Sequence, residues 1–151
     1  MSKVILCRGI QGSGKTTWAK NYCKTNPNTI RVNRDDIRKM FNSEWSKEIE
    51  VIVKKCELEA IRSAINIGFD VIVDDVSNLN IKTESLIRDI IREYNRAGFT
   101  FSKSHKECVL IYKDFFIPLD ECVYNDSRRT NPIGRSIITD TYNKYSSIIN
   151  S

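Results

Sequence analysis

The chain has 151 residues, of which 40% are hydrophobic and 28% charged, and its formal net charge is +5. No apolar run is long enough to cross a bilayer, and the five cysteines and the single histidine, His105, lack the spacing of a zinc site. We therefore expect one cytoplasmic domain over residues 1–151, with reduced structural cysteines, no membrane association and a polyanionic partner favoured by the positive charge.

Strands and helices are expected to alternate along the chain. The predicted strands are residues 3–8, 29–32, 69–74 and 107–113, each short and rich in apolar side chains. The predicted helices are residues 15–24, a segment after Asn33, 44–67 closed by Gly68, 83–97 closed by Gly98, 118–127 and 134–149. This alternation predicts an α/β fold with a central parallel sheet flanked by helices. The loops that follow the strands would then lie along one edge, where such sheets bind ligands.

The first predicted strand runs into a complete phosphate-binding loop, G-x-x-x-x-G-K-[ST], and a helix follows it. Glycines allow close backbone approach, so successive N–H groups at the helix N-terminus can surround an anion. Lys15 is expected to reach the β- and γ-phosphates of ATP, and the hydroxyl of Thr16 is expected to bind Mg²⁺. The predicted nucleotide-binding residues of the loop are Gly9, Gly12, Ser13, Gly14, Lys15, Thr16 and Thr17.

A polar stretch, residues 33–38 with the sequence NRDDIR, follows the second strand. Asp35 lies where the strand gives way to a helix, and a carboxylate there could take the proton of an attacking hydroxyl. Arg38 lies on the same helix face and could bind an acidic group of the acceptor, such as a phosphate. The alternative is that Asp35 caps the helix and Arg38 is solvated, and the residues alone leave both open.

Two further clusters of charged residues narrow the class of reaction. The third strand ends in Asp74 and Asp75, which is the position of the metal-associated acid in phosphate-loop enzymes, and the pattern does not decide which of them faces the site. Near the end of the chain, Arg128 and Arg129 fall in residues 125–132, which we interpret as a lid whose arginine neutralises charge on the transferred group. An exposed basic loop is the alternative.

Taken together, these stretches resemble the 5′-hydroxyl polynucleotide kinase family, in particular the kinase module of the phage-type enzymes. The resemblance covers nearly the whole chain and implies a phosphate-loop kinase fold with an arginine-bearing lid. It implies that Asp35 is the general base and that Arg38 contacts the 3′ phosphate of the acceptor. It also implies that Asp75 is a second essential acid that binds substrate and that Arg128 is the lid arginine and contacts ATP.

The sequence departs from the family pattern at two of these positions. One extra residue separates Asp75 from Asn78, so Asp74 remains an alternative for the second acid. Tyr124 stands where the family commonly has a basic residue, and Arg129 directly follows Arg128, so the lid arginine could be either.

We therefore expect transfer of the γ-phosphate of ATP, with Mg²⁺, to the 5′-hydroxyl end of DNA or RNA, in nucleic acid repair. The resemblance also suggests a viral or phage gene as one origin. The nearest alternative is a kinase of another hydroxyl, on a modified base in DNA, a nucleoside or a small metabolite. A nucleotide-dependent switch is a weaker alternative, because the guanine-specifying Asn-Lys-x-Asp motif is absent.

Overall fold

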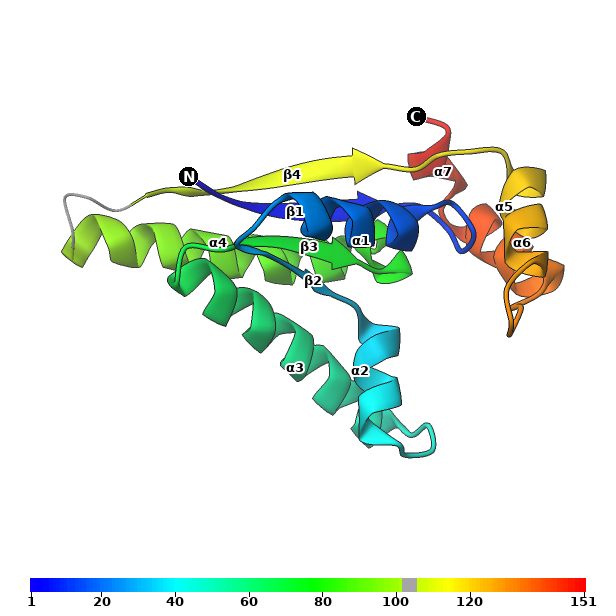
Figure 1. The fold of residues 1–151 in the computed structure, drawn as a ribbon, viewed down its shortest axis with the longest axis horizontal. Helices are drawn as coiled ribbons and strands as arrows, with labels where there is room; N and C mark the ends of the chain where they lie inside the picture. The colour runs from blue at the N-terminus through cyan, green and yellow to red at the C-terminus, as the bar shows by residue number, and fades with distance from the viewer. Residues whose placement is uncertain (102–105) are drawn as a thin grey trace.

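The computed structural model describes residues 1–101 and 106–151, and His105 lies outside the described residues (Figure 1). The strands are β1 (Ser2–Arg8), β2 (Thr29–Val32), β3 (Asp70–Asp74) and β4 (Cys108–Asp114). The helices are α1 (Lys15–Thr25), α2 (Arg34–Phe41), α3 (Lys47–Asn66), α4 (Ile81–Phe101), α5 (Leu119–Ser127), α6 (Arg135–Lys144) and α7 (Ser146–Ile149), with a 3-10 turn, η1 (Val76–Leu79). Among the described helices, none is both long and apolar enough to span a membrane.

The four described strands form one parallel sheet in the order β2-β3-β1-β4, as the alternation of elements predicts. The two central strands are apolar on both faces because helices cover both faces. On one face, Leu6 and Val73 pack with Ile61 of α3 and Ile87 of α4. On the other face, α1 covers the sheet through a smaller cluster that includes Ala19.

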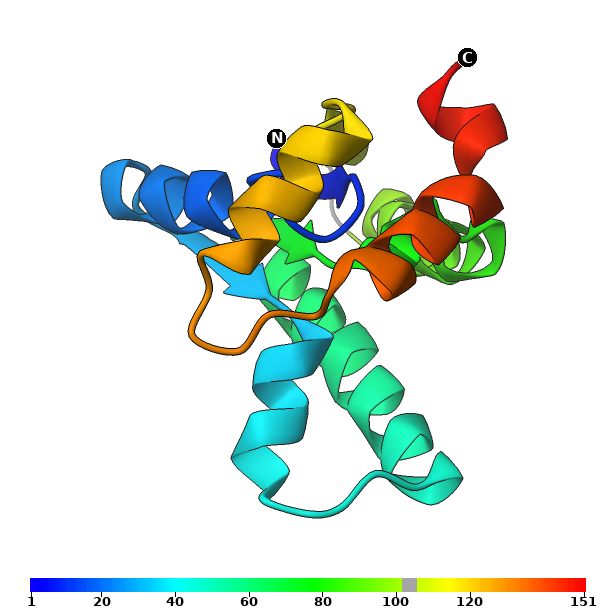
Figure 2. The same ribbon diagram turned by 90° about the vertical axis from the view of Figure 1, so that its right-hand side faces the viewer.

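A third apolar cluster lies beyond the ends of the strands. Cys122 of α5 and Ile138 of α6 pack there against Ile10 of the phosphate loop and Leu79 of η1. In the view onto this edge, α5, α6 and the connection between them lie in front of the strand ends (Figure 2). Residues 125–132, which the sequence predicts to be a lid, therefore lie at this edge of the sheet, at the end of α5 and in the connection to α6.

Several predicted helix bounds differ from the structure: the helix expected over residues 44–67 begins at Lys47, after its N-cap Ser46, and the helix expected from residue 83 begins at Ile81. Gly68 does end α3 with a left-handed φ of 84°, but α4 runs through Gly98 to Phe101. A helix accommodates an interior glycine at a cost of about 1 kcal/mol relative to alanine, so glycine alone does not stop it. The single helix expected over residues 134–149 is divided at Tyr145, whose φ of −110° interrupts it between α6 and α7.

Candidate functional site

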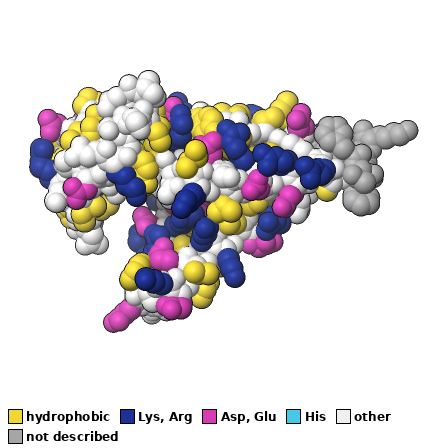
Figure 3. Space-filling view, turned by 180° about the vertical axis from the view of Figure 1, so that it is seen from behind, with side chains coloured by type: hydrophobic (Ala, Val, Ile, Leu, Met, Phe, Trp, Pro, Cys, Tyr) yellow, Lys and Arg dark blue, Asp and Glu magenta, His cyan; other side chains and the backbone are white. Residues whose placement is uncertain are grey.

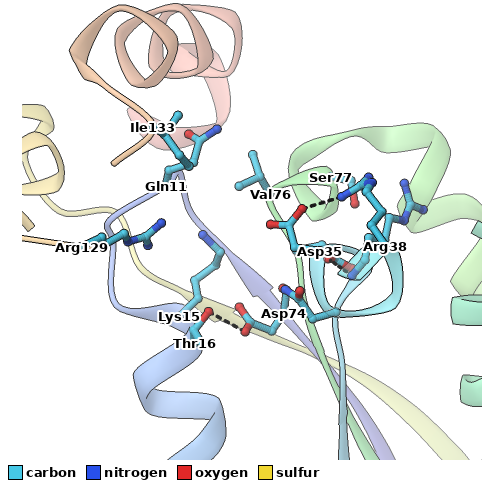
Figure 4. Close-up of a pocket in the computed structure, with 13 residues that line it drawn as sticks. Gln11, Lys15, Thr16, Asp35, Arg38, Asp74, Val76, Ser77, Arg129 and Ile133 are labelled. Carbon is cyan, nitrogen blue, oxygen red and sulfur yellow. Dashed lines mark hydrogen bonds and ion pairs between the residues drawn. The ribbon is translucent and has the colours of Figure 1, made fainter. Parts of the chain in front are cut away.

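A cavity of about 290 Å³ opens at the carboxyl edge of the sheet (Figure 4). Its walls are Gln11, Lys15 and Thr16; Asn33, Arg34, Asp35 and Arg38; Asp74, Asp75, Val76 and Ser77; and Arg129 and Ile133. The phosphate loop, the start of α2, the end of β3 and the α5–α6 connection thus each contribute one part of it. Parallel strands place these loops together, which is why residues far apart in sequence meet here.

The phosphate loop is held in shape by left-handed glycines and by contact with α5. Gly12 and Gly14 have φ values of 78° and 96°, and a Cβ on Gly12 would lie 2.2 Å from the carbonyl oxygen of Cys122. The Nζ of Lys15 donates to the carbonyl oxygens of Gly9 and Ile10, at 2.8 Å each. Burial lowers the pKa of Lys15 to about 8, because the charged form loses hydration.

The N-terminus of α1 is open at the end of this loop. Gly14 is its N-cap and supplies no side-chain cap, so the first N–H groups of the helix are left for an anion. The Ser13 hydroxyl stands 3.4 Å from the Nζ of Lys15, and Thr17 lies exposed in the first turn. The loop therefore has the arrangement that phosphate binding requires.

Asp74 connects the end of β3 to the phosphate loop. The Thr16 hydroxyl donates to its Oδ2 at 2.8 Å (Figure 4). The Nε of Arg31 donates to the same oxygen at 2.8 Å. Since the hydroxyl proton of Thr16 is directed at Asp74, the lone pairs of its oxygen are free for a cation. Asp74 is 1% exposed, and the ion pair with Arg31 supports its charge at that depth.

Asp75, the next residue, is directed toward α2 and α3. Its Oδ1 accepts a hydrogen bond of 2.8 Å from the backbone N–H of Arg34, the first residue of α2. Burial and the neighbouring carboxyl group of Glu57 raise the pKa of Asp75 to about 9. The role of Asp75 in substrate binding stays a prediction, although the residue does line the cavity.

The start of α2 places Asp35 and Arg38 on the wall opposite Lys15 (Figure 4). Asn33, not Asp35, is the N-cap of α2, and its side chain accepts from the N–H of Asp36 at 3.0 Å. The carboxylate of Asp35 is therefore free of the capping role, and its side chain is 75% exposed. The Nη1 of Arg38 donates to Asp35 at 2.5 Å.

Glu50 of α3 holds Arg38 in place. Both its carboxylate oxygens accept from the guanidinium, at 2.5 and 2.8 Å, in a two-point contact. The same pairing lowers the pKa of Glu50 and raises that of Arg38. Arg38 is thus fixed on the cavity wall, with 34% of its side chain exposed, rather than moving freely in solvent.

The lid segment brings Arg129 to the cavity and leaves Arg128 outside its walls. Arg128 is the C-cap of α5, and its guanidinium carbon lies 5.8 Å from the centre of the Tyr124 ring. Consecutive residues at a helix end project about 100° apart, so only one of the two faces inward. Arg128 does not line this cavity, and its contact with ATP stays a prediction.

The segment that carries these arginines is fixed at both ends. Asp126 is 1% exposed, and its two oxygens accept from the N–H groups of Ile133 and Gly134 at 3.1 and 2.9 Å. The side-chain amide of Asn125 donates to the carbonyl oxygen of Gly12 at 3.0 Å. The lid is thereby connected directly to the phosphate loop.

Sequence reasoning missed the acidic residues that support the site from α3. Glu57 falls within the buried stripe that includes Val53 and Ile61, and it is fully buried. A charged residue at a buried position of an amphipathic helix indicates an internal partner, so this signal was present in the pattern. Glu50 lies at the border of the same face, and nothing in the sequence distinguishes it from a solvated glutamate.

Comparison with known proteins identifies a family model and several solved structures that this chain resembles. A family model described as an AAA domain matches residues 4–134. A chain of the Pnkp1/Rnl/Hen1 RNA repair complex superposes with a TM-score of 0.75 at 24% identity, covering 97% of this chain and 44% of that one. A chain from another structure of the Pnkp1/Rnl/Hen1 complex gives a TM-score of 0.64 at 26% identity, covering 86% and 40%.

Shikimate kinase from Acinetobacter baumannii, in complex with shikimate, gives a TM-score of 0.56 at 14% identity, covering 99% of this chain and 79% of that enzyme. The fold is therefore that of the phosphate-loop kinases, as the sequence predicts. The chain spans less than half the length of the two RNA repair chains that it matches, 44% and 40%.

Proposed function

The chain belongs to the AAA domain family, and from its kinase-like fold and the cavity we propose that it transfers the γ-phosphate of ATP to the 5′-hydroxyl end of DNA or RNA. The phosphate-loop kinase fold itself supports a phosphotransferase. One observation supports transfer to the end of a polynucleotide. The pair Asp35 and Arg38 faces Lys15 and Thr16 across a single cavity.

The phosphate loop forms the donor side of the proposed reaction. Its N–H groups and Lys15 bind the phosphates of ATP, and Lys15 supplies the positive charge. Thr16 would hold Mg²⁺, and the bound ion would neutralise charge on the transferred group. A hydroxyl oxygen oriented by Asp74 suits this hard cation, which takes few protein ligands beside the phosphates and water.

Asp35 and Arg38 form the acceptor side. Asp35 accepts the proton of the 5′-hydroxyl as that oxygen attacks, and its exposed carboxylate is open to an incoming strand. Arg38 binds the first phosphate on the 3′ side of that hydroxyl. The two hydrogen bonds to Glu50 hold its guanidinium in position. Positioning of this kind supplies much of the rate in phosphoryl transfer.

Charge on one face of the molecule adds little selectivity. The face seen in Figure 3 carries Lys and Arg side chains interspersed with Asp and Glu rather than one continuous basic patch. The net charge of +5 attracts a polyanion in general. Recognition of the end of a strand is therefore assigned to the cavity and to Arg38.

The test is incubation of the protein with γ-labelled ATP, Mg²⁺ and an oligonucleotide that has a 5′-hydroxyl end. We expect label at the 5′ terminus, mapped by nuclease digestion, and no label on the matched oligonucleotide that already carries a 5′ phosphate. DNA and RNA, single-stranded and duplex, are compared in parallel. Label on an internal base, or none on any strand, would overturn the proposal.

Transfer to a small hydroxyl compound is the second candidate. A cavity of about 290 Å³ is at the lower end of the size of small-molecule sites, and shikimate kinase shares the fold. The same assay with nucleosides and small polyols as acceptors separates the two. Higher kcat/KM for one of these than for any oligonucleotide would favour the second candidate.

A further inference from the structure

Three ionisable side chains form a buried cluster behind the cavity wall: Arg34 of α2, Glu57 of α3 and Asp75 at the end of β3. Arg34 donates from Nε to Oε2 of Glu57 at 2.5 Å and from its backbone N to Oδ1 of Asp75 at 2.8 Å. Glu57 is 0% exposed and Asp75 5% exposed, so both carboxyl groups are almost entirely shielded from bulk solvent. The cluster contains two acids and one base.

The two carboxyl groups are held by the same residue, since Arg34 donates to both, and the carboxyl group of Glu57 contributes to the raised pKa of Asp75. The remaining oxygens, Oε1 of Glu57 and Oδ2 of Asp75, are both buried and have no N–H or O–H donor among the described residues. Two ionised carboxylates side by side in this setting would repel each other and leave both oxygens unpaired. One proton between them removes the repulsion and satisfies both oxygens at once.

Charge balance indicates which group stays ionised. Glu57 already accepts the short hydrogen bond from the guanidinium of Arg34, which stabilises its negative form. Asp75 accepts a single backbone N–H on Oδ1, which the carbonyl oxygen of a neutral acid does equally well. Arg34 and Arg38 are the charged groups of α2 near Asp75, and each is engaged by a glutamate of α3.

We infer that Asp75 is a neutral carboxyl group that donates to Glu57 and, with it, fixes the first residue of α2, so that Asp35 and Arg38 stand correctly in the cavity. Asp75 is then a positioning residue rather than a charged contact to substrate. Arg34 is held twice, by its backbone and by its side chain, and Asp35 is the next residue in the helix. The kinetic consequence of this inference rests on the proposed function.

Isosteric amides give a sharp test, because an amide reproduces the hydrogen bonds of a neutral acid without its proton. In Asp75→Asn the side-chain oxygen can accept from Arg34 and the NH₂ can donate to Glu57. In Glu57→Gln the oxygen can accept from Arg34 and the NH₂ can donate to Asp75. Asp75→Ala and Glu57→Leu remove the bridge.

We expect Asp75→Asn to keep kcat within about threefold of the natural protein, and Glu57→Gln to lower it more, because this change removes the ionised partner of Arg34. The two truncations should lower kcat by about a hundredfold and raise the KM of the acceptor more than that of ATP, since small displacements of catalytic groups have effects of this size. If Asp75→Asn is as inactive as Asp75→Ala, Asp75 acts through its charge and the inference is wrong.

A second measurement does not depend on turnover. Infrared spectra of the natural protein with ¹³C-labelled aspartate should contain the C=O band of a protonated carboxyl group at neutral pH, and Asp75→Asn should lack it. Absence of the band in the natural protein overturns the inference, even if the enzyme is an active polynucleotide kinase. If no phosphate is transferred to any oligonucleotide but the band is present, the proposed function fails and the neutral Asp75 stands.

Discussion

The hydroxyl of Thr16 and the carboxylate of Asp74 are joined by a 2.8 Å hydrogen bond that links the phosphate loop to the end of β3. Asp75 follows at once in extended conformation, with a φ of −132°. Successive side chains of an extended segment project to opposite sides, so the two acids serve different elements. Asp74 supports the phosphate loop, and Asp75 supports α2.

Asp74→Asn should raise the Mg²⁺ concentration needed for half-maximal transfer and lower kcat by at least about tenfold. The amide is neutral, so it orients Thr16 less firmly and leaves Arg31 without its buried charge partner. A Mg²⁺ titration of the initial rate measures this. Asp140→Asn, the same change at an exposed residue of α6, is the control, and an equal shift in that variant would contradict the assignment.

ATP binding should weaken as the pH rises through about 8. Burial lowers the pKa of Lys15 to about 8 in the free protein, so above this pH the free protein holds a neutral amine that must gain a proton to pair with phosphate. Calorimetric affinities between pH 6.5 and 9.5 at constant ionic strength measure the effect. Adenosine, which has no phosphates, serves as the control ligand. An ATP affinity that is flat across this range would count against the prediction.

The two neighbouring arginines should differ in their effect on turnover. Arg129 lines the cavity and Arg128 does not, so Arg129→Ala should lower kcat by about a hundredfold. Arg128→Ala should lower it by less than about threefold. The opposite order in single-turnover rates would restore Arg128 as the lid arginine, as the family resemblance implies.

Glu50→Gln should raise the KM of the oligonucleotide by about tenfold and leave the KM of ATP nearly unchanged. The carboxylate holds the guanidinium of Arg38 at two points, and the amide retains one acceptor oxygen only. Steady-state kinetics with each substrate varied in turn measures the split. A double-mutant cycle with Arg38→Ala should show strong coupling, and additive effects would show that Glu50 acts independently of Arg38.

The sequence was sufficient for the sheet and for the phosphate loop because both depend on local patterns. Continuous apolar runs such as residues 4–7 specify strands buried on both faces, and the glycine pattern specifies the loop between strand and helix. The sequence also predicts that Asp35 lies at the ligand-binding edge of the sheet, since parallel topology places the strand ends on one edge.

The remaining features depend on tertiary contacts that have no local signature. The supports of the site, Glu50 and Glu57, come from a helix whose predicted role was to cover the sheet. The direction of Arg129 depends on how Asp126 closes the segment that follows α5, and sequence spacing could not supply that. The length of α4 beyond Gly98 likewise depends on packing rather than on propensity.

The measurement that tests the central claim most directly compares the natural protein with Asp35→Ala in single-turnover transfer from γ-labelled ATP to a 5′-hydroxyl oligonucleotide. Asp140→Ala is the matched control, and ATP affinity is measured for all three proteins. We predict that Asp35→Ala lowers the transfer rate by at least about a hundredfold while ATP affinity changes by less than about threefold. A normal rate of transfer in Asp35→Ala would contradict the account.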